Sequence, residues 1–196
     1  MARTREFDTG AAVAAAMDVF WDRGYEATSI QDLVEATGVG RGSLYAAFGS
    51  KDGLYEAALR HYAAHSTGRM AERLGREAPV RTVLRDLLYS VVEDIVANPG
   101  RRGCLMTNTA VERLPRDPTA GAIVGAAFDR VAESVTAALR RGRAAGELPP
   151  DTDLTALADL FTTVIQGLRV QGKTGADRRR LITVVDAALK ALPGPG

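Results

Sequence analysis

Apolar positions recur along this chain with the spacing of an α-helix. Val13, Ala16, Met17 and Phe20 fall on one face at intervals of three or four residues, so a first helix is expected over about 7–23. No stretch has the alternating pattern of a strand. The sequence therefore predicts an all-α fold of about nine helices.

Turn and breaker residues divide the second part of the chain into further helices. Asn98-Pro99-Gly100 is a strong turn signal, and prolines and glycines separate the other apolar stripes. The helix expected at 154–170 is apolar nearly all round, which requires burial on both sides. These later helices are expected over about 51–74, 80–97, 103–113, 119–145, 154–170 and 176–192.

The stretch 25–54 carries the most specific pattern in the chain. Thr28 and Gln31 form a T-x-x-Q run, which predicts a capping box at the start of a short helix. Gly38 predicts the end of that helix, since glycine adopts the left-handed C-cap conformation without a Cβ clash. Two short helices joined by a tight turn are expected here.

The second of these short helices has the character of a recognition helix. It begins near Arg41 and turns Leu44 and Phe48 inward at i, i+4, while its other face is short or polar at the N-terminal end. Lys51 follows in the first turn of the next helix, where a cation opposes the helix dipole. A neighbouring phosphate would explain that lysine.

This stretch resembles the DNA-binding signature of the tetracycline-repressor (TetR) family of one-component bacterial regulators. The resemblance covers about the first quarter of the chain, and the serine that typically caps the family's recognition helix is Gly40 here. The matching residues are Phe20, Gly24, Tyr25, Thr28, Ser29, Ile30, Gly38, Val39, Gly42, Leu44, Tyr45, Phe48, Ser50, Lys51 and Leu54.

The resemblance implies a three-helix helix-turn-helix DNA-binding domain over 1–50. A helical effector-binding and dimerisation domain would follow over 51–196, with its last two helices paired across a homodimer. Phosphate contacts are expected from Thr28, Ser29, Tyr45 and Lys51, and base contacts from Arg41, Gly42, Ser43 and Ala46.

The net charge of the chain neither requires nor excludes DNA binding. The chain has 25 basic and 24 acidic residues, so it is not a strongly basic nucleic-acid binder. DNA binding would depend on placement, with Arg41 and Lys51 on one side, helix N-termini beside them and an N-terminal arm carrying Arg3 and Arg5. The alternative for that arm is a solvated end.

Two apolar helices and a few polar groups suggest sites in the second domain. An apolar face left uncovered in a monomer favours a homodimer. Trp21 is expected in the core or an interface, and Asn108 and Glu112 are either ordinary polar residues or pocket groups. Dimer contacts are expected from Leu157, Phe161, Val164, Leu168, Leu181 and Val185, and effector contacts from Tyr62, His65, Cys104, Asn108, Phe128 and Phe161.

Other chemistry is sparse. One cysteine, Cys104, excludes an internal disulfide and is typical of a reducing cytoplasm, and no apolar run approaches the ~18 residues of a membrane span. His61 and His65 have metal-binding spacing, but no third ligand is near in sequence. Neither an enzyme activity, nor a cofactor, nor a metal is expected.

The function predicted from these residues is that of a homodimeric repressor, released from a palindromic double-stranded operator by a small molecule. One alternative is a thiol sensor of electrophiles or oxidants, in which a helix N-terminus, Arg101 and Arg102 lower the pKa of Cys104. Against it stands an inert, buried thiol. Another alternative is a helical small-molecule-binding protein or enzyme that does not bind DNA.

Overall fold

The computed structural model describes residues 7–98, 100 and 102–194, so Arg3, Arg5 and Arg101 lie outside the described residues. Across the described residues the chain forms nine α-helices and no strand, which confirms the all-α prediction. The expected bounds agree to within about three residues. The helices are α1 (Thr9–Arg23), α2 (Ile30–Thr37), α3 (Arg41–Phe48), α4 (Lys51–Leu74), α5 (Val80–Val96), α6 (Leu105–Arg113), α7 (Pro118–Ala144), α8 (Leu154–Lys173) and α9 (Arg178–Leu189).

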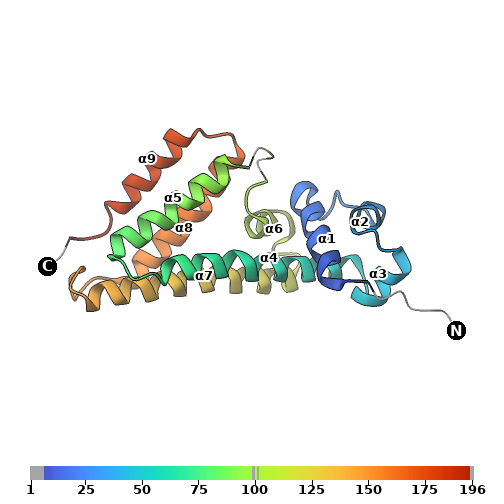
Figure 1. Cartoon of the computed structure of the whole chain (residues 1–196), viewed down its shortest axis with the longest axis horizontal. Coiled ribbons are helices and arrows are strands. Elements are labelled where there is room, and N and C mark those ends of the chain that lie inside the picture. Colours follow the sequence, from blue (N-terminus) through green and yellow to red (C-terminus); the bar gives the residue numbers. More distant parts are fainter. Residues whose placement is uncertain (1–6, 99, 101, 195–196) are drawn as a thin grey trace.

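Two long helices form the spine of the molecule. α4 and α7 run side by side along the longest axis, with α1, α2 and α3 at one end and α5, α8 and α9 at the other (Figure 1). The short α6 lies between these two groups (Figure 1). No helix in the described part of the chain is long and apolar enough to cross a membrane.

Two apolar cores lie along this spine. One joins Phe20, Leu33 and Leu44 of the first three helices to Leu105 of α6 and Ile123 of α7. The expected domain boundary at residue 50 stays a prediction, because this core extends well beyond it.

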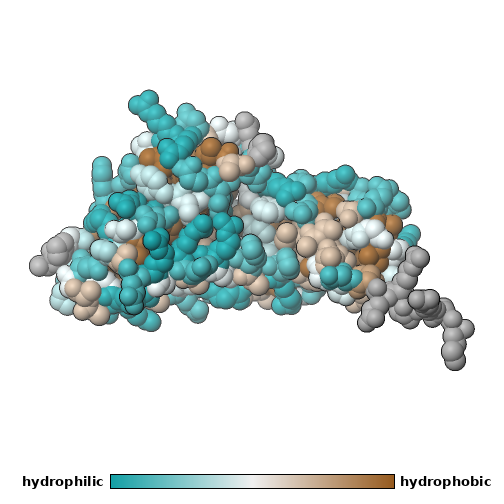
Figure 2. Space-filling view, in the orientation of Figure 1, coloured by the Kyte–Doolittle hydropathy of each residue, from teal (hydrophilic) through white to brown (hydrophobic). Residues whose placement is uncertain are grey.

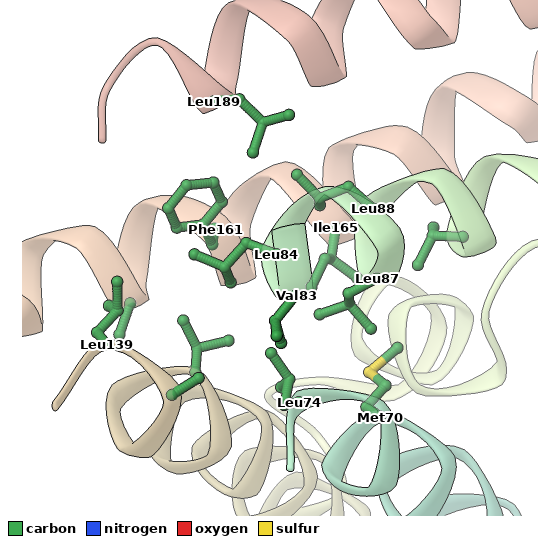
Figure 3. Packing of buried hydrophobic residues seen from close by; sticks show 14 of the residues in the cluster. Met70, Leu74, Val83, Leu84, Leu87, Leu88, Leu139, Phe161, Ile165 and Leu189 are labelled. Atoms are coloured by element: carbon green, nitrogen blue, oxygen red, sulfur yellow. The ribbon is translucent and has the colours of Figure 1, made fainter. Parts of the chain in front are cut away.

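The second core holds α5, α8 and α9 together against the ends of α4 and α7. Phe161 of α8 and Leu84 of α5 lie close together at its centre, and Leu189 of α9 faces them (Figure 3). Phe161 and Leu84 are fully buried.

The start of α2 differs by one residue from the predicted capping box. Ser29 is the N-cap and accepts a hydrogen bond from the Asp32 backbone N–H at 3.1 Å, while Asp32 accepts from the Ser29 N–H at 2.8 Å. The Thr28–Gln31 box is therefore wrong. Asp32 suits the position better than Gln31, because a carboxylate in the first turn also complements the helix dipole. Hydrogen bonds from Ser29, then Arg23 beside it, lower the pKa of Asp32 to about 2.

Most of the residues predicted to form the dimer face lie inside the chain instead. α8 packs on α5 and α9, and its apolar side is consumed by that contact. Four of the six residues expected at the dimer face are therefore covered within the chain itself, whereas Leu157 and Val164 stay a prediction. Phe161, Leu168, Leu181 and Val185 are buried in the second core, and Leu157 and Val164 are half-buried against it.

The side chains on the outward faces of α8 and α9 are mostly small or apolar. Leu160 on α8 and Val184 on α9 are 38% and 40% exposed, which is high for large aliphatic side chains. Figure 2 shows a mostly hydrophilic face interrupted by hydrophobic patches, including one near α5 and α9. Exposed neighbours on the two outward faces are Ala156, Thr163, Gly167, Ala187 and Ala191.

Candidate nucleic-acid interface and effector cavity

α2 and the turn after it hold α3 in a fixed position, with part of α3 exposed to solvent. Gly38 ends α2 with φ +67°, and Leu44 anchors α3 in the first core. Gly40 has no side chain to cap α3, as its sequence implied. Of the residues expected at bases, Arg41, Gly42 and Ala46 are exposed and Ser43 is half-buried; of those expected at phosphates, Ser29 is exposed and Tyr45 and Lys51 are half-buried.

Thr28 does not fit its expected part in DNA binding. It is buried, and its hydroxyl donates a hydrogen bond to the Gly24 carbonyl at 2.6 Å. A phosphate cannot reach a hydroxyl in that position. The structure thus gives Thr28 a part in holding the turn between α1 and α2.

Lys51 lies beside an aromatic ring that sequence reasoning did not connect to it. Its Nζ is 4.1 Å from the centroid of Tyr25, whose hydroxyl donates to Asp52 at 2.7 Å. Burial and then Asp52 raise the pKa of Tyr25 to about 12, so the ring stays neutral. The ring face holds the ammonium at the start of α4.

Glu112 of α6 binds the turn that follows α1. Its carboxylate accepts hydrogen bonds from the backbone N–H groups of Tyr25 at 3.0 Å and Glu26 at 2.9 Å. Gly24 has φ +83°, and a Cβ there would lie 2.9 Å from a Glu112 oxygen. This close approach joins the DNA-binding unit to α6.

Arg113 adds an ionic contact beside Glu112. Its guanidinium pairs with Asp117 at 2.7 Å, Asp52 at 3.0 Å and Glu26 at 3.3 Å, and lies 3.8 Å from the centroid of the Tyr25 ring. Only 16% of the side chain is exposed. The last residues of α6 thus contact α4 and the α1–α2 turn together.

A cavity of about 470 Å³ lies among α1, α4, α5 and α8. Tyr62 and His65, both expected at the effector site, line it. Trp21 lines it as well, although the sequence suggested core or interface. Its ring packs edge-to-face on Tyr62 at 4.9 Å, and its Nε1 donates to the Gly103 carbonyl at 3.2 Å.

A second cavity of about 380 Å³ lies beside the first one. Cys104 and Asn108 line it, and Trp21, Arg169 and Lys173 line both cavities. Four of the six expected effector residues are thus brought to two neighbouring cavities.

The two phenylalanines expected at the effector site line neither of these cavities. Phe161 is in the second core, and Phe128 packs against the first core; neither lines a cavity described above. A phenylalanine on an apolar helix face has the same sequence pattern whether it meets a ligand or a neighbouring helix. The Phe161 assignment is wrong, because its side chain is fully buried in the core, and the Phe128 assignment stays a prediction.

Cys104 is the N-cap residue of α6 and is buried. Burial alone raises the pKa of a thiol, but the Arg169 guanidinium, which donates to Sγ at 3.1 Å, and hydrogen bonds from Thr107 and Tyr62 lower the pKa of Cys104 below its usual value. Burial and then Cys104 raise the pKa of Tyr62. The thiol therefore has a cation and donors around it.

Of the two cations that the sequence suggested for Cys104, Arg101 lies outside the described residues and Arg102 is engaged elsewhere. Arg102 pairs with Asp18 at 2.9 Å and with Asp22, and its guanidinium lies 5.1 Å from the centroid of the Trp21 ring. Sequence proximity could not identify Arg169, because it comes from α8, 65 residues later. No group of three or more possible metal-ligating side chains occurs in the described part of the chain.

A short exposed helix on a three-helix base, joined to a helical domain with a cavity, defines a one-component transcriptional regulator. Residues 12–58 match the model of bacterial regulatory proteins of the tetR family, and residues 79–188 match the tetracyclin repressor-like C-terminal domain. The chain belongs to the TetR family and is a DNA-binding transcriptional regulator.

Proteins similar to this chain are named as transcriptional regulators. The HTH-type transcriptional repressor ComR of Escherichia coli is 33% identical over 195 residues, covering 97% of this chain and 91% of ComR. The uncharacterised HTH-type regulator YezE of Bacillus subtilis is 32% identical, covering 98% of this chain and all of YezE. A cysteine mutant of the TetR family regulator CifR, solved with 26-bp operator DNA, has 38% identity and a TM-score of 0.87, with 98% of this chain and 100% of that chain covered.

Proposed function

We propose that this regulator is a homodimeric repressor that leaves a palindromic operator when a small molecule occupies the larger cavity, the one among α1, α4, α5 and α8. The observation that carries the proposal is the position of α6. Cys104 and Asn108 at its start line the neighbouring cavity and accept hydrogen bonds from Arg169 and Lys173, which line both cavities. Glu112 at its end holds the turn of the DNA-binding unit. The names of ComR, a repressor, and of CifR, bound to operator DNA, support the direction of control.

On DNA, α3 enters the major groove with its exposed N-terminal face toward the bases. Arg41, Gly42, Ser43 and Ala46 approach base edges there. Ser29, Tyr45 and Lys51 contact phosphates, and Lys51 reaches them from its place on the Tyr25 ring.

The dimer forms through the outward faces of α8 and α9. Leu160 and Val184 supply apolar area, and small residues such as Gly167 and Ala187 allow close helix approach. Four helices, two from each copy, would cover both faces. This arrangement puts the two copies of α3 at a fixed separation, which the spacing of the operator half-sites must match.

Release follows from a shift of α6. A ligand in the larger cavity that favours a different position of Arg169 and Lys173, which line both cavities, also shifts Cys104 and Asn108, to which they donate hydrogen bonds. The shift of α6 then moves Glu112, and with it the backbone of Tyr25 and Glu26. Operator affinity then falls by the ratio of the ligand's affinities for the two positions.

The operator itself gives the first test. Selection of bound sites from random DNA should return inverted repeats, because a two-fold dimer places one α3 in each half-site. Half-site centres should be about 34 Å apart, one helical turn, or a multiple of that spacing. Selected sites without any inverted repeat would contradict the docking of paired α3 helices.

A second candidate function is specific to the surroundings of Cys104. Its sulfur accepts a hydrogen bond from Arg169 and borders a cavity, so a thiolate there is stabilised and a small molecule has a space to reach it. In this form of the proposal, an electrophile adds to the thiolate and moves the start of α6. The CifR complex is that of a cysteine mutant, so operator binding in that relative does not need those cysteines.

N-ethylmaleimide tests this second candidate. The Cys104 thiolate should add to the maleimide double bond in the native dimer, with a proton taken up at the neighbouring carbon, and operator should be released. Mass spectrometry and fluorescence anisotropy of labelled operator measure the two effects. Cys104→Ser should bind operator normally and lose the release. Reaction only after unfolding in urea would rule out the thiol mechanism and leave reversible binding.

A further inference from the structure

The ionisable side chains around the larger cavity are nearly all of the basic residue types. His61, His65, Arg69 and Arg73 follow one another at four-residue intervals along α4, so they share one side of that helix. α8 contributes a second row, Arg169 and Lys173, also four residues apart. The only acidic side chain among the lining residues is that of Asp94.

Some of these cations are balanced by carboxylates. Arg69 pairs with Asp94 at 3.3 Å, and Arg102, also in the lining, pairs with Asp18 and Asp22. Arg169 is engaged by the sulfur of Cys104.

Arg73 and Lys173 are left without a balancing carboxylate. Across the described residues, neither forms an ion pair. The Lys173 Nζ donates to the neutral side-chain oxygen of Asn108 at 3.0 Å. Two positive charges therefore border the cavity uncompensated, and a bound anion would be favoured there.

Most of the rest of the cavity wall is apolar or aromatic, with Ser66 and Asn98 as its uncharged polar residues. Met70, Leu87 and Val91 are buried, and Trp21 and Tyr62 meet at one side. Since His61, His65 and Lys173 are exposed while these apolar residues are buried, the cationic side is the open one. Such a cavity fits a molecule with an apolar body and a charged head.

We infer that the effector is an amphipathic organic anion, whose carboxylate or equivalent group binds at the cationic side of the cavity bordered by Arg73 and Lys173 and whose apolar body lies against Trp21 and Met70. This inference rests on the proposed function, since it names the chemical class of the molecule that occupies the same cavity. Charge-assisted hydrogen bonding and the field of these two cations give the head group its affinity. A cation of similar shape is repelled by the same side chains.

Three ligands of matched shape test the charge requirement. Octanoate, octanamide and octylammonium share one alkyl body, and Trp21, the single tryptophan of the chain, reports occupancy through its fluorescence. At constant ionic strength octanoate should bind roughly tenfold more tightly than octanamide, and octylammonium more weakly than both. Equal binding of octanoate and octanamide, or no binding of octanoate, would overturn the inference.

Charge-neutralising variants locate the anion. Arg73→Gln and Lys173→Gln should each weaken octanoate binding by roughly tenfold, the usual cost of one charge-assisted hydrogen bond. Arg140→Gln and Lys190→Gln make the same charge change at exposed positions outside the cavity and should leave octanoate binding unchanged. Equal losses in all four variants would mean a general charge effect and contradict an anion site.

Operator binding separates this inference from the proposed function. Anisotropy of the selected operator fragment is measured with and without saturating octanoate. Charge-dependent octanoate binding without release would support the anion site and contradict control through the cavity. Release by octanamide, with octanoate inactive, would support control through the cavity and overturn the anion class.

Discussion

Val184→Lys or Leu160→Lys is expected to separate the proposed dimer and to weaken operator binding by roughly a hundredfold or more. Each side chain lies on the outward face of α8 or α9, where its apolar surface would be covered by the partner copy. A lysine there would bring an unpaired ammonium into a helix–helix contact, and its desolvation would outweigh the free energy gained from the remaining apolar contact. Operator affinity falls because two linked half-site contacts become two independent ones.

Sedimentation velocity measures the loss of the dimer, and titration with labelled operator measures the loss of affinity. The control is Val96→Lys, because Val96 is also an exposed valine, at 48%, but belongs to the C-terminal end of α5. A cation at a helix C-terminus is favourable, so this variant should remain dimeric and bind operator normally. Dimeric Val184→Lys and Leu160→Lys proteins would show that α8 and α9 do not form the interface.

The sequence predicted α8 and α9 as the dimer helices, which stays a proposal, but most of the residues it selected on them are buried within the chain. Apolar spacing identifies a buried face without saying what buries it, so Phe161 and Leu181 appeared as partner contacts. In the fold that face is consumed by α5 and by the contact between α8 and α9. Leu160 and Val184 are exposed, but the sequence did not single them out, because their neighbours on the same helix faces are small or polar.

Most local signals were reliable, and the Thr28–Gln31 capping box, displaced by one residue, is the exception. Gly38, Leu44 and the helix bounds follow from nearest-neighbour geometry, which the sequence contains directly. Contacts between distant segments, such as Arg169 with Cys104 or Glu112 with the Tyr25 backbone, depend on how α6 and α8 are placed. A lone acid or cation on a helix surface carries no sign of such a partner.

Arg113→Ala is expected to lower the free energy of unfolding by about 2–4 kcal/mol. The loss leaves Asp117 and Asp52 without their common cation, and breaking a buried ion pair from one side costs several kcal/mol. The value is placed below the fully buried range because Asp52 is 56% exposed. The stacking of the guanidinium on Tyr25 disappears too.

The matched control is Arg116→Ala, an exposed arginine three residues along the chain, which should change stability by no more than about 0.5 kcal/mol. Urea unfolding followed by Trp21 fluorescence measures both variants at one protein concentration. An Arg113→Ala protein as stable as the Arg116→Ala control would show that this cluster of charges does not stabilise the junction.

The dependence of this loss on pH identifies its electrostatic part. Burial raises the pKa of Asp117, but the Ala120 N–H and Arg113 outweigh it and hold that pKa below its ordinary value of 3.8. A carboxyl with a depressed folded-state pKa adds stability above about pH 4, and this stability is lost as the pH falls through the folded-state pKa. Arg113→Ala removes part of the depression, so the gap to wild type should be full at pH 7 and narrow below about pH 4. A gap that stays constant into acid would assign the loss to packing of the arginine stem instead of its charge.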